Sequence, residues 1–150
     1  MIRPAIESDE QQIRHCAEEA YARYVPLIGR KPAPMVADFK AHIAAEEAFV
    51  ATDDQGAFQG FIVFYDDGDH VLLENVAVLP QVAGLGVGKA LITFCEDTAR
   101  RKGFKQVQLY TNEKMTENLS IYPKLGYVEI DRRTENGFNR VYFEKSVAPE

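Results

Sequence analysis

The sequence predicts an α/β protein built on a mixed sheet, and three patterns carry this prediction. An apolar strand, a glycine-rich turn and an amphipathic helix follow one another over residues 71–101. Before them, apolar residues repeat with a period of two over residues 49–65, which is typical of antiparallel strands. After the helix, residues 105–110 form another strand pattern. Because a crossover helix separates this strand from the one at 71–79, the two should be parallel.

In chain order, local patterns predict seven strands and four helices. The strands are expected at residues 2–5, 49–52, 58–65, 71–79, 105–110, 127–134 and 139–147, and the helices at about 9–23, 35–47, 87–101 and within 111–127. Pro4 favours an edge position for the first strand, because proline cannot donate to a ladder. Ser8 and Asp9 are candidate N-caps of the first helix. Three prolines prevent residues 25–34 from being helical throughout.

Turn residues predict how the strands connect. Short turns at residues 53–56 and 66–69 should join the middle three strands into an antiparallel meander. The strand at 71–79 is apolar on both faces, as a central covered strand requires, and Pro80 should end its pairing. Asn136-Gly137 predicts a tight turn in a last hairpin, in which no residue indicates chemistry.

The glycine turn predicts an anion-binding site. Gly84, Gly86 and Gly88 can adopt backbone angles that a Cβ forbids. Free N–H groups point out of the helix N-terminus that follows, and the macrodipole favours negative charge there. A phosphate or pyrophosphate is the expected ligand.

Two nucleotide-binding patterns fit this turn poorly. The P-loop requires Gly-Lys-Ser/Thr, but Gly88-Lys89 is followed by Ala90, so no hydroxyl is available for Mg²⁺. The Rossmann pattern requires a third glycine three residues after the second, where this chain has Lys89 or Leu91.

The remaining match is residues 81–86, which fit Q/R-x-x-G-x-G/A. This hexapeptide, with its preceding strand and following helix, resembles the acyl-CoA signature of the GNAT superfamily of N-acetyltransferases. Ala83 stands where many relatives carry arginine, so backbone amides would hold the pyrophosphate largely unaided. By this resemblance, the residues expected to contact acetyl-CoA are Val76, Ala77, Val78, Ala83, Gly84, Leu85, Gly86, Val87 and Gly88.

Residues 111–127 resemble the second GNAT signature, a short helix with Asn and Tyr that ends in Leu-Gly-Phe/Tyr. In the family, the tyrosine hydroxyl lies near the thioester sulfur and the asparagine helps to fix the pantetheine arm. Tyr122 and Asn118 occupy the matching positions. Pro123 removes one backbone bond and disfavours the α region for Tyr122, so a kink is expected there.

The resemblance covers essentially the whole chain and implies one GNAT domain, residues 1–150. Its fold would be a mixed, bent central sheet of about seven strands flanked by four helices. The strands at 71–79 and 105–110 should splay to admit the cofactor. The implied reaction moves an acetyl group from acetyl-CoA to an amine of a small molecule or peptide, by direct attack in a ternary complex and without a metal.

Glu74 is the candidate base. An acceptor amine must lose a proton to a base or an ordered water before it attacks. Glu74 lies in an otherwise apolar strand, so burial should raise its pKa, and alternation should place it on one face with Val76 and Val78. The alternative is a structural carboxylate that pairs with a neighbouring cation. By resemblance, the oxyanion donor is a backbone N–H near Val78, and Tyr122 protonates the departing thiolate.

The acceptor site can be placed by resemblance alone. In the GNAT fold the first helical region overhangs this site, which makes Tyr21, Tyr24, Arg30 and Met35 candidates for acceptor contact. Taken singly, each is more typical of a core or surface residue.

Composition limits the partners. The net charge of −6, with no basic run, argues against nucleic-acid binding and mildly favours cationic small molecules. Cys16 and Cys95 lack metal-ligand spacing and are expected to be structural thiols. Neither a signal-like segment nor a run of 18 apolar residues is present, so a cytoplasmic location without a membrane partner is expected.

A non-catalytic domain of the same fold, which senses acyl-CoA or a small amine, is the alternative function. The glycine turn and Tyr122 together favour the enzyme. The acceptor's identity and the oligomeric state, a homodimer included, stay open.

Overall fold

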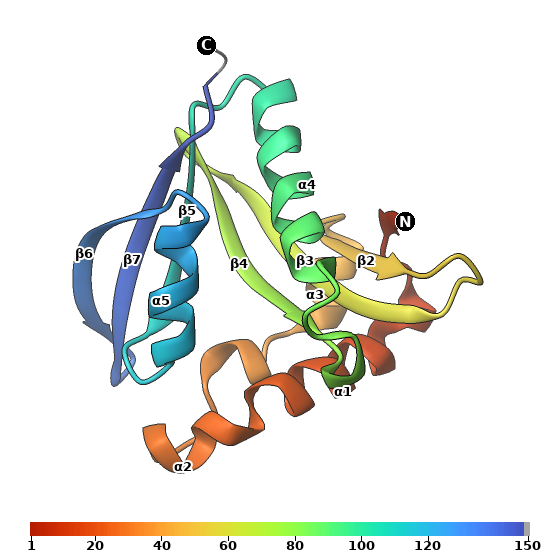
Figure 1. Ribbon diagram of the computed structural model, residues 1–150, viewed down its shortest axis with the longest axis horizontal. Coiled ribbons are helices and arrows are strands. Elements are labelled where there is room, and N and C mark those ends of the chain that lie inside the picture. The colour runs from red at the N-terminus through yellow and green to blue at the C-terminus, as the bar shows by residue number, and fades with distance from the viewer. Residues whose placement is uncertain (149–150) are drawn as a thin grey trace.

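The computed structural model describes residues 1–148, which form a seven-stranded mixed sheet with helices on both faces (Figure 1). The strand order is β1-β2-β3-β4-β5-β7-β6. The strands are β1 (Ile2–Pro4), β2 (Ala48–Thr52), β3 (Phe58–Asp67), β4 (His70–Val78), β5 (Gln106–Asn112), β6 (Val128–Glu135) and β7 (Phe138–Ser146). The helices are α1 (Glu10–Tyr21), α2 (Val25–Ile28), α3 (Phe39–Ala44), α4 (Val87–Arg101) and α5 (Thr116–Lys124).

This architecture confirms the predicted α/β fold. The four expected helices are α1, α3, α4 and α5, and α2 adds a single turn within the proline-containing loop. The expected domain of residues 1–150 includes residues 149–150, which lie outside the described part. Within residues 1–148, no helix combines the length and apolar composition that a membrane crossing requires.

The sheet has an antiparallel half and a second half that joins it through one parallel pair. Strands β1 to β4 are antiparallel neighbours, which confirms the meander. Beyond β5, strands β7 and β6 are antiparallel again. The turn between β6 and β7 has positive φ at Asn136 (54°) and Gly137 (80°), as a tight hairpin turn requires.

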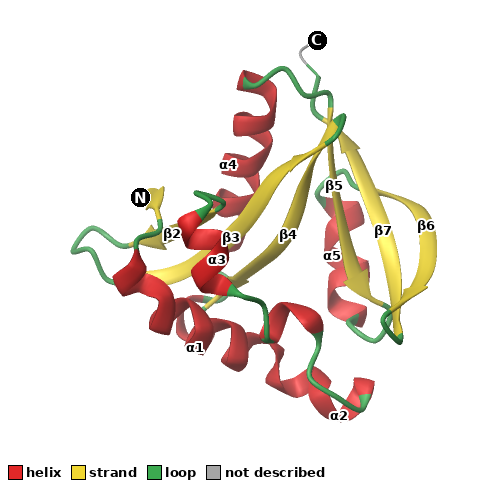
Figure 2. Cartoon of the chain, turned by 180° about the vertical axis from the view of Figure 1, so that it is seen from behind, coloured by secondary structure: helices red, strands yellow, loops and turns green. Residues whose placement is uncertain are grey.

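The parallel pair β4–β5 is short, and it produces the opening on which the site depends. Pairing covers only residues 71–73 of β4 against residues 107–109 of β5. Beyond this point β5 stays paired to β7 as far as Asn112, while β4 follows β3. The two strands therefore meet at one end and diverge toward the other, as Figure 2 shows from behind. The expected splay is present.

Two buried clusters lie on opposite faces of the sheet. On one face α4 and α5 pack against it, with Leu91 and Cys95 at the centre of the cluster. On the other face α1 and α3 supply Cys16 and Phe39. Both cysteines are buried free thiols, which fits the structural role expected for them.

A β-bulge in β4 decides where Glu74 points. Two consecutive residues of β3 face three residues of β4, 73–75, so Glu74 is the extra one. Its side chain contacts His42 of α3. Val76 and Val78 pack instead against the cluster under α4. The prediction that Glu74 shares a face with Val76 and Val78 is wrong, because alternation does not hold across a bulge.

The second helix is shorter than the predicted residues 35–47. The carboxylate of Asp38 accepts a hydrogen bond of 3.1 Å from a backbone N–H in the first turn of α3 and caps it. Met35 precedes this cap in a separate 3-10 turn, residues 33–35, which contains a proline. At the other end Glu46 has a φ of 61°, a left-handed angle that cannot continue a helix.

The first helix begins without the predicted caps at Ser8 and Asp9. The carboxylate of Asp9 turns back to accept two hydrogen bonds from Arg3, of 2.8 and 3.0 Å, and one of 2.8 Å from the Ile6 N–H. The Arg3 guanidinium is the main reason that the pKa of Asp9 is lowered. Asp9 therefore ties β1 to α1 rather than capping the helix.

A buried carboxylate joins α4 to the last hairpin. Glu96 is only 5% exposed. It accepts a hydrogen bond of 2.8 Å from the Tyr127 hydroxyl and pairs with the Lys145 ammonium at 3.1 Å. Burial and this carboxylate raise the pKa of Tyr127, so the phenol stays a donor.

Replacing Lys145 with methionine should destabilise the fold by about 3 kcal/mol, because it leaves the Glu96 carboxylate buried without a cation. Urea unfolding measures the loss. The control is Lys105→Met, which removes an exposed lysine that is in no ion pair within residues 1–148. The double variant E96Q/K145M should recover part of the stability. An unchanged unfolding midpoint in K145M would contradict the prediction.

Candidate active site

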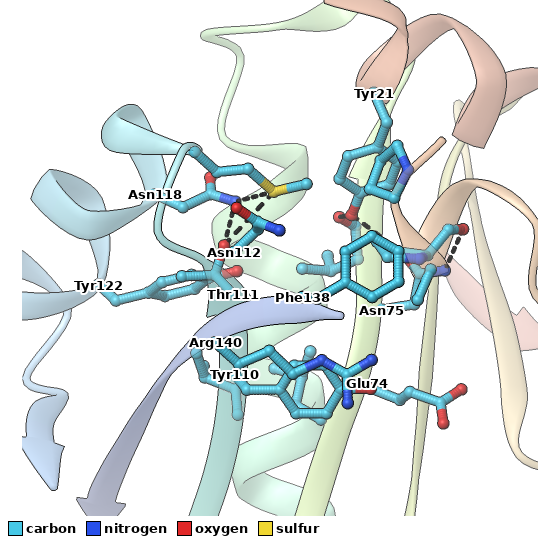
Figure 3. Close-up of a pocket in the computed structure, with 17 residues that line it drawn as sticks. Tyr21, Glu74, Asn75, Tyr110, Thr111, Asn112, Asn118, Tyr122, Phe138 and Arg140 are labelled. Atoms are coloured by element: carbon cyan, nitrogen blue, oxygen red, sulfur yellow. Dashed lines mark hydrogen bonds between the residues drawn. The ribbon is translucent and has the colours of Figure 1, made fainter. Parts of the chain in front are cut away.

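The opening between β4 and β5 contains a pocket that α1, α5, β7 and residues 32–34 close (Figure 3). Its wall is part aromatic and part polar. The polar and aromatic residues that line it are Tyr21, Glu74, Asn75, Tyr110, Thr111, Asn112, Asn118, Tyr122, Phe138 and Arg140. The structure thus brings Tyr122, Glu74, Asn118, Val76 and Tyr21, all predicted from the sequence, to one cavity.

The glycine turn at the N-terminus of α4 has the geometry of an anion cradle. Gly84 and Gly86 have φ of 84° and 86°, which only glycine adopts without strain. The first internal bond of the helix is the one that Ala90 N–H donates to the Gly86 carbonyl, at 3.0 Å. The N–H groups of residues 87–89 precede that bond and have no helical acceptor. The turn, with Ala83 and Leu85, is exposed, so these donors are accessible to an anion.

Within residues 1–148, no strand pairs with the edge of β4 beside the pocket, although the Val76 carbonyl accepts a hydrogen bond from the Tyr21 hydroxyl. Because β5 pairs only with residues 71–73, the backbone groups of β4 that point toward β5 after Leu73 have no strand partner there. Val76 lines the pocket at this edge, Ala77 is buried on the opposite face, and Val78 ends the strand. A ligand with amide groups can add along such an edge as a short strand does.

Tyr122 lies on α5 with a buried ring and an available hydroxyl. The ring packs near Tyr127 and Phe143, at centroid distances of 6.0 and 5.9 Å. Within residues 1–148 the Tyr122 hydroxyl makes no hydrogen bond. Every fully buried side-chain oxygen in this part has a partner, so this hydroxyl is not fully buried. The hydroxyl therefore reaches the pocket that Tyr122 lines. Burial raises the pKa of Tyr122 to about 12, so at neutral pH it keeps its proton.

Pro123 lies inside helix α5, directly before its last residue. The helix continues through Pro123 to Lys124 and is closed by Gly126, whose φ is 96°. Asn118 lies one turn before Tyr122 on the same face. Its amide nitrogen donates a hydrogen bond of 3.2 Å to the Thr111 hydroxyl, which orients the side chain at the pocket wall.

Glu74 lies at the pocket edge within a polar network. One carboxylate oxygen accepts a hydrogen bond of 2.9 Å from the Tyr65 hydroxyl, and the other is 2.8 Å from His42 Nε2. The other ring nitrogen of His42 is 2.8 Å from Glu47. Burial and the Glu74 carboxylate raise the pKa of Tyr65, so the phenol remains a donor. The surroundings of Glu74 are therefore polar, unlike the apolar neighbourhood that the strand sequence predicts.

Tyr21 alone of the four acceptor candidates lines the pocket. Its hydroxyl oxygen is 3.0 Å from both the Asn75 side-chain oxygen and the Val76 carbonyl oxygen, and these two acceptors share its single proton. Tyr24 and Met35 are buried in the cluster under α1. Arg30 is exposed, bonds the Asn136 carbonyl and stacks on Phe138 at 3.7 Å, so it fastens the loop after α2 to the last hairpin.

Sequence reasoning expected β5 to border the opening, but it named no pocket residue on β5 and missed the contribution of β7. Tyr110, Phe138 and Arg140 line the pocket, although the hairpin showed no sign of chemistry in the sequence. The available signal was Arg140, a charged residue next to a run of three apolar residues in β7. Asn75 was also missed, and it is only 3% exposed. Its burial is compensated because its amide oxygen accepts a hydrogen bond from Tyr21 and its amide nitrogen donates one to the Pro34 carbonyl.

Known proteins share both the sequence pattern and the fold. The Acetyltransferase (GNAT) family matches residues 11–127. Probable N-acetyltransferase 14 of Xenopus tropicalis is 31% identical over 87 residues, 57% of this chain and 42% of that protein. Uncharacterized N-acetyltransferase YjgM of Escherichia coli K12 is 32% identical over 65 residues, 43% of this chain and 39% of that protein. The matches thus span about two fifths of these curated relatives.

Solved structures extend the likeness to nearly the whole fold. The ribosomal-protein-S18-alanine N-acetyltransferase from Escherichia coli superposes with a TM-score of 0.76 at 18% identity, over 100% of this chain and 95% of that one. A PaiA N-acetyltransferase from Thermoplasma acidophilum, solved with coenzyme A, has a TM-score of 0.72 at 17% identity, over 97% and 98% of the chains. At these identities they show the fold alone. The family match covers most of the sequence, and the fold agrees with it: the chain belongs to the GNAT acetyltransferase family.

Proposed function

We propose that this protein transfers the acetyl group of acetyl-CoA to an amine of a small molecule or peptide, by direct attack in a ternary complex. The observation that carries the proposal is the pocket between β4 and β5. A protonated tyrosine hydroxyl that has no hydrogen-bond partner within residues 1–148 reaches this cavity together with a carboxylate, and the edge of β4 that pairs with no described strand lines it. Family membership supports acetyl transfer in general.

The glycine turn is the proposed pyrophosphate site. The amides of residues 87–89 supply donors at a helix N-terminus, and Gly84 and Gly86 keep side chains out of the approach. Ala83 contributes no charge there, so affinity depends on the backbone. The pantetheine arm would follow residues 76–78 along β4, with Asn118 on the facing wall. A neighbour of the same fold was solved with coenzyme A, which supports coenzyme A as the ligand.

Tyr122 is the proposed acid. When the amine attacks the thioester carbonyl, the carbon–sulfur bond breaks and the sulfur leaves with the electron pair. A neutral phenol close to that sulfur can donate its proton, and Tyr122, whose pKa burial raises to about 12, is neutral at physiological pH. The backbone N–H near Val78 is the proposed donor to the carbonyl oxygen.

Glu74 is the proposed base, acting directly or through a water. Tyr65 and His42 hold its two oxygens, so the carboxylate has a defined position at the pocket edge. The same contacts also fit the structural alternative, in which Glu74 anchors α3 to the sheet. Kinetics of one variant separate the two roles.

Glu74→Gln should lower kcat/KM by about a hundred-fold and flatten the acidic limb of the pH–rate profile, because the amide cannot accept a proton. The matched control is Glu47→Gln, which removes the other carboxylate beside His42 but does not line the pocket. If E74Q keeps both the acidic limb and most of the rate, Glu74 is structural and the base is bulk water or another group.

The proposed function is tested by acetyl-CoA turnover with a panel of amines, amino acids, polyamines, aminoglycosides and peptides. Thiol release that depends on an amine, with the acetylated amine identified by mass, supports the enzyme. Acetyl-CoA binding by calorimetry without turnover of any acceptor favours the sensor instead. The free, buried cysteines fit the reducing cytoplasm that we propose as its location.

A further inference from the structure

Arg140 of β7 places a largely buried positive charge in the wall of the pocket. Its side chain is only 12% exposed. The guanidinium carbon lies 4.5 Å from the centre of the Tyr110 ring and 5.7 Å from that of Phe138. Figure 3 shows the side chain crossing the front of the cavity over Tyr110. Two aromatic rings therefore orient a largely buried positive charge at the pocket.

The donors of this guanidinium are poorly satisfied within residues 1–148. An arginine carries five N–H donors, and a buried one requires acceptors. Arg140 forms an ion pair with the Glu135 carboxylate, but the distance of 3.5 Å is longer than a charge-assisted hydrogen bond. Glu135 also accepts from the Tyr142 hydroxyl. No fully buried side-chain nitrogen in the described part lacks a partner, so the unused donors of Arg140 are those that solvent reaches.

The pocket also contains a charge of the opposite sign. Glu74 lines it from β4, and its carboxylate is held by Tyr65 and His42 rather than by Arg140. No ion pair joins Glu74 to Arg140 among the described side chains. A separated anion and cation in one cavity fit a ligand that carries an ammonium and a carboxylate. This local pattern differs from the preference for cations that the net charge of −6 indicates.

We propose that the acceptor carries a carboxylate beside its amine, and that Arg140 binds this carboxylate. The inference rests on the proposed function and narrows its substrate class. A planar guanidinium held by rings presents parallel N–H groups that match the two carboxylate oxygens. The carboxylate could belong to a free amino acid or to an acidic residue at a peptide N-terminus, and the test includes both.

The experiment compares acceptors that differ only in the carboxylate. Leucine, leucinamide and 3-methylbutylamine form one series, and the C-terminally amidated dipeptides Asp-Ala-NH2 and Asn-Ala-NH2 form another. Rates are compared at equal concentrations of free amine, since the amine pKa differs between these compounds. The wild type should acetylate one carboxylate acceptor, leucine or Asp-Ala-NH2, about ten- to a hundred-fold more efficiently than the matching amide, as expected for hydrogen bonds to a charged group.

Arg140→Gln should abolish that preference by raising KM for the carboxylate acceptor, and Arg140→Lys should restore part of it. The matched control is Arg133→Gln. Arg133 also stacks on a ring, with its guanidinium carbon 4.4 Å from the centre of Tyr142, but it does not line the pocket. The control should keep the wild-type preference, and acetyl-CoA affinity should be equal in all of these variants.

Three results would overturn the inference. The wild type could acetylate the amides as efficiently as the acids, or R140Q could lower both classes equally. In either case amine-dependent acetyl transfer persists and the proposed function stands. If no acceptor is acetylated, calorimetry with coenzyme A plus N-acetylleucine or N-acetyl-Asp-Ala-NH2 decides. Absent binding, or binding equal in R140Q and the wild type, rejects the carboxylate site.

Discussion

Tyr122→Phe should lower kcat by about 10- to 1,000-fold, the usual contribution of a positioned acid, while acetyl-CoA affinity changes little. The change removes only the hydroxyl, which has no partner within residues 1–148, so no internal hydrogen bond is lost. The ring contacts with Tyr127 and Phe143 remain. Burial raises the pKa of Tyr122 to about 12, so the wild-type hydroxyl is protonated over the whole neutral range. Single-turnover kinetics measure the chemical step.

Tyr142→Phe is the control for this measurement. This substitution also removes a tyrosine hydroxyl, which donates a hydrogen bond to Glu135 in the wild type. Tyr142 does not line the pocket. Its rate should be close to that of the wild type. A Y122F enzyme that turns over at the wild-type rate, under conditions where chemistry limits, would show that the thiolate leaves without help from this tyrosine.

Gly86→Val should weaken acetyl-CoA binding by about a hundred-fold or more. A Cβ at Gly86 meets no atom within 4 Å, so the loss does not come from a clash inside the protein. It comes from the φ of 86°, which a β-branched residue adopts only at a cost of about 1–2 kcal/mol. Relief of that strain redirects the amides of residues 87–89, and the valine side chain occupies the approach to them.

Gly56→Val separates binding from strain. Gly56 also has a left-handed φ, 82°, and open space around it, but it lies in the turn between β2 and β3. Both variants should lose similar stability in thermal unfolding, whereas only G86V should lose affinity in calorimetry. A folded G86V protein with wild-type affinity would place the pyrophosphate elsewhere.

The sequence by itself determined the local elements around the site. The strand before Pro80, the left-handed Gly84 and Gly86, and the start of α4 all follow from the backbone preferences of adjacent residues. The hairpin at Asn136-Gly137 is predictable for the same reason. The family signatures lie in such segments, so Tyr122 and Asn118 could also be found before the structure.

Helix lengths and caps were predicted less well, because they depend on competing partners. Asp9 has the right position for a cap, but an arginine of β1 offers its carboxylate a stronger, charged partner. Met35 fits a helical pattern, but a proline-containing 3-10 turn and the cap at Asp38 separate it from α3. Nothing in the spacing of apolar residues shows which of two local arrangements has the lower free energy.

Only the tertiary structure decided what surrounds the reacting groups. The bulge at Glu74 lies where the register between β3 and β4 shifts by one residue. It turns the carboxylate toward His42, 32 positions earlier in the chain. Arg140 acquires its place through the pairing of β7 with β5, which sets it beside Tyr110 at the open edge of β4. These contacts join residues far apart in sequence, and their energies depend on the packing of whole strands rather than on neighbouring residues. The sequence could therefore place the glycine turn and Tyr122, while the opposite charges of the acceptor pocket appear only when β4, β5 and β7 are assembled.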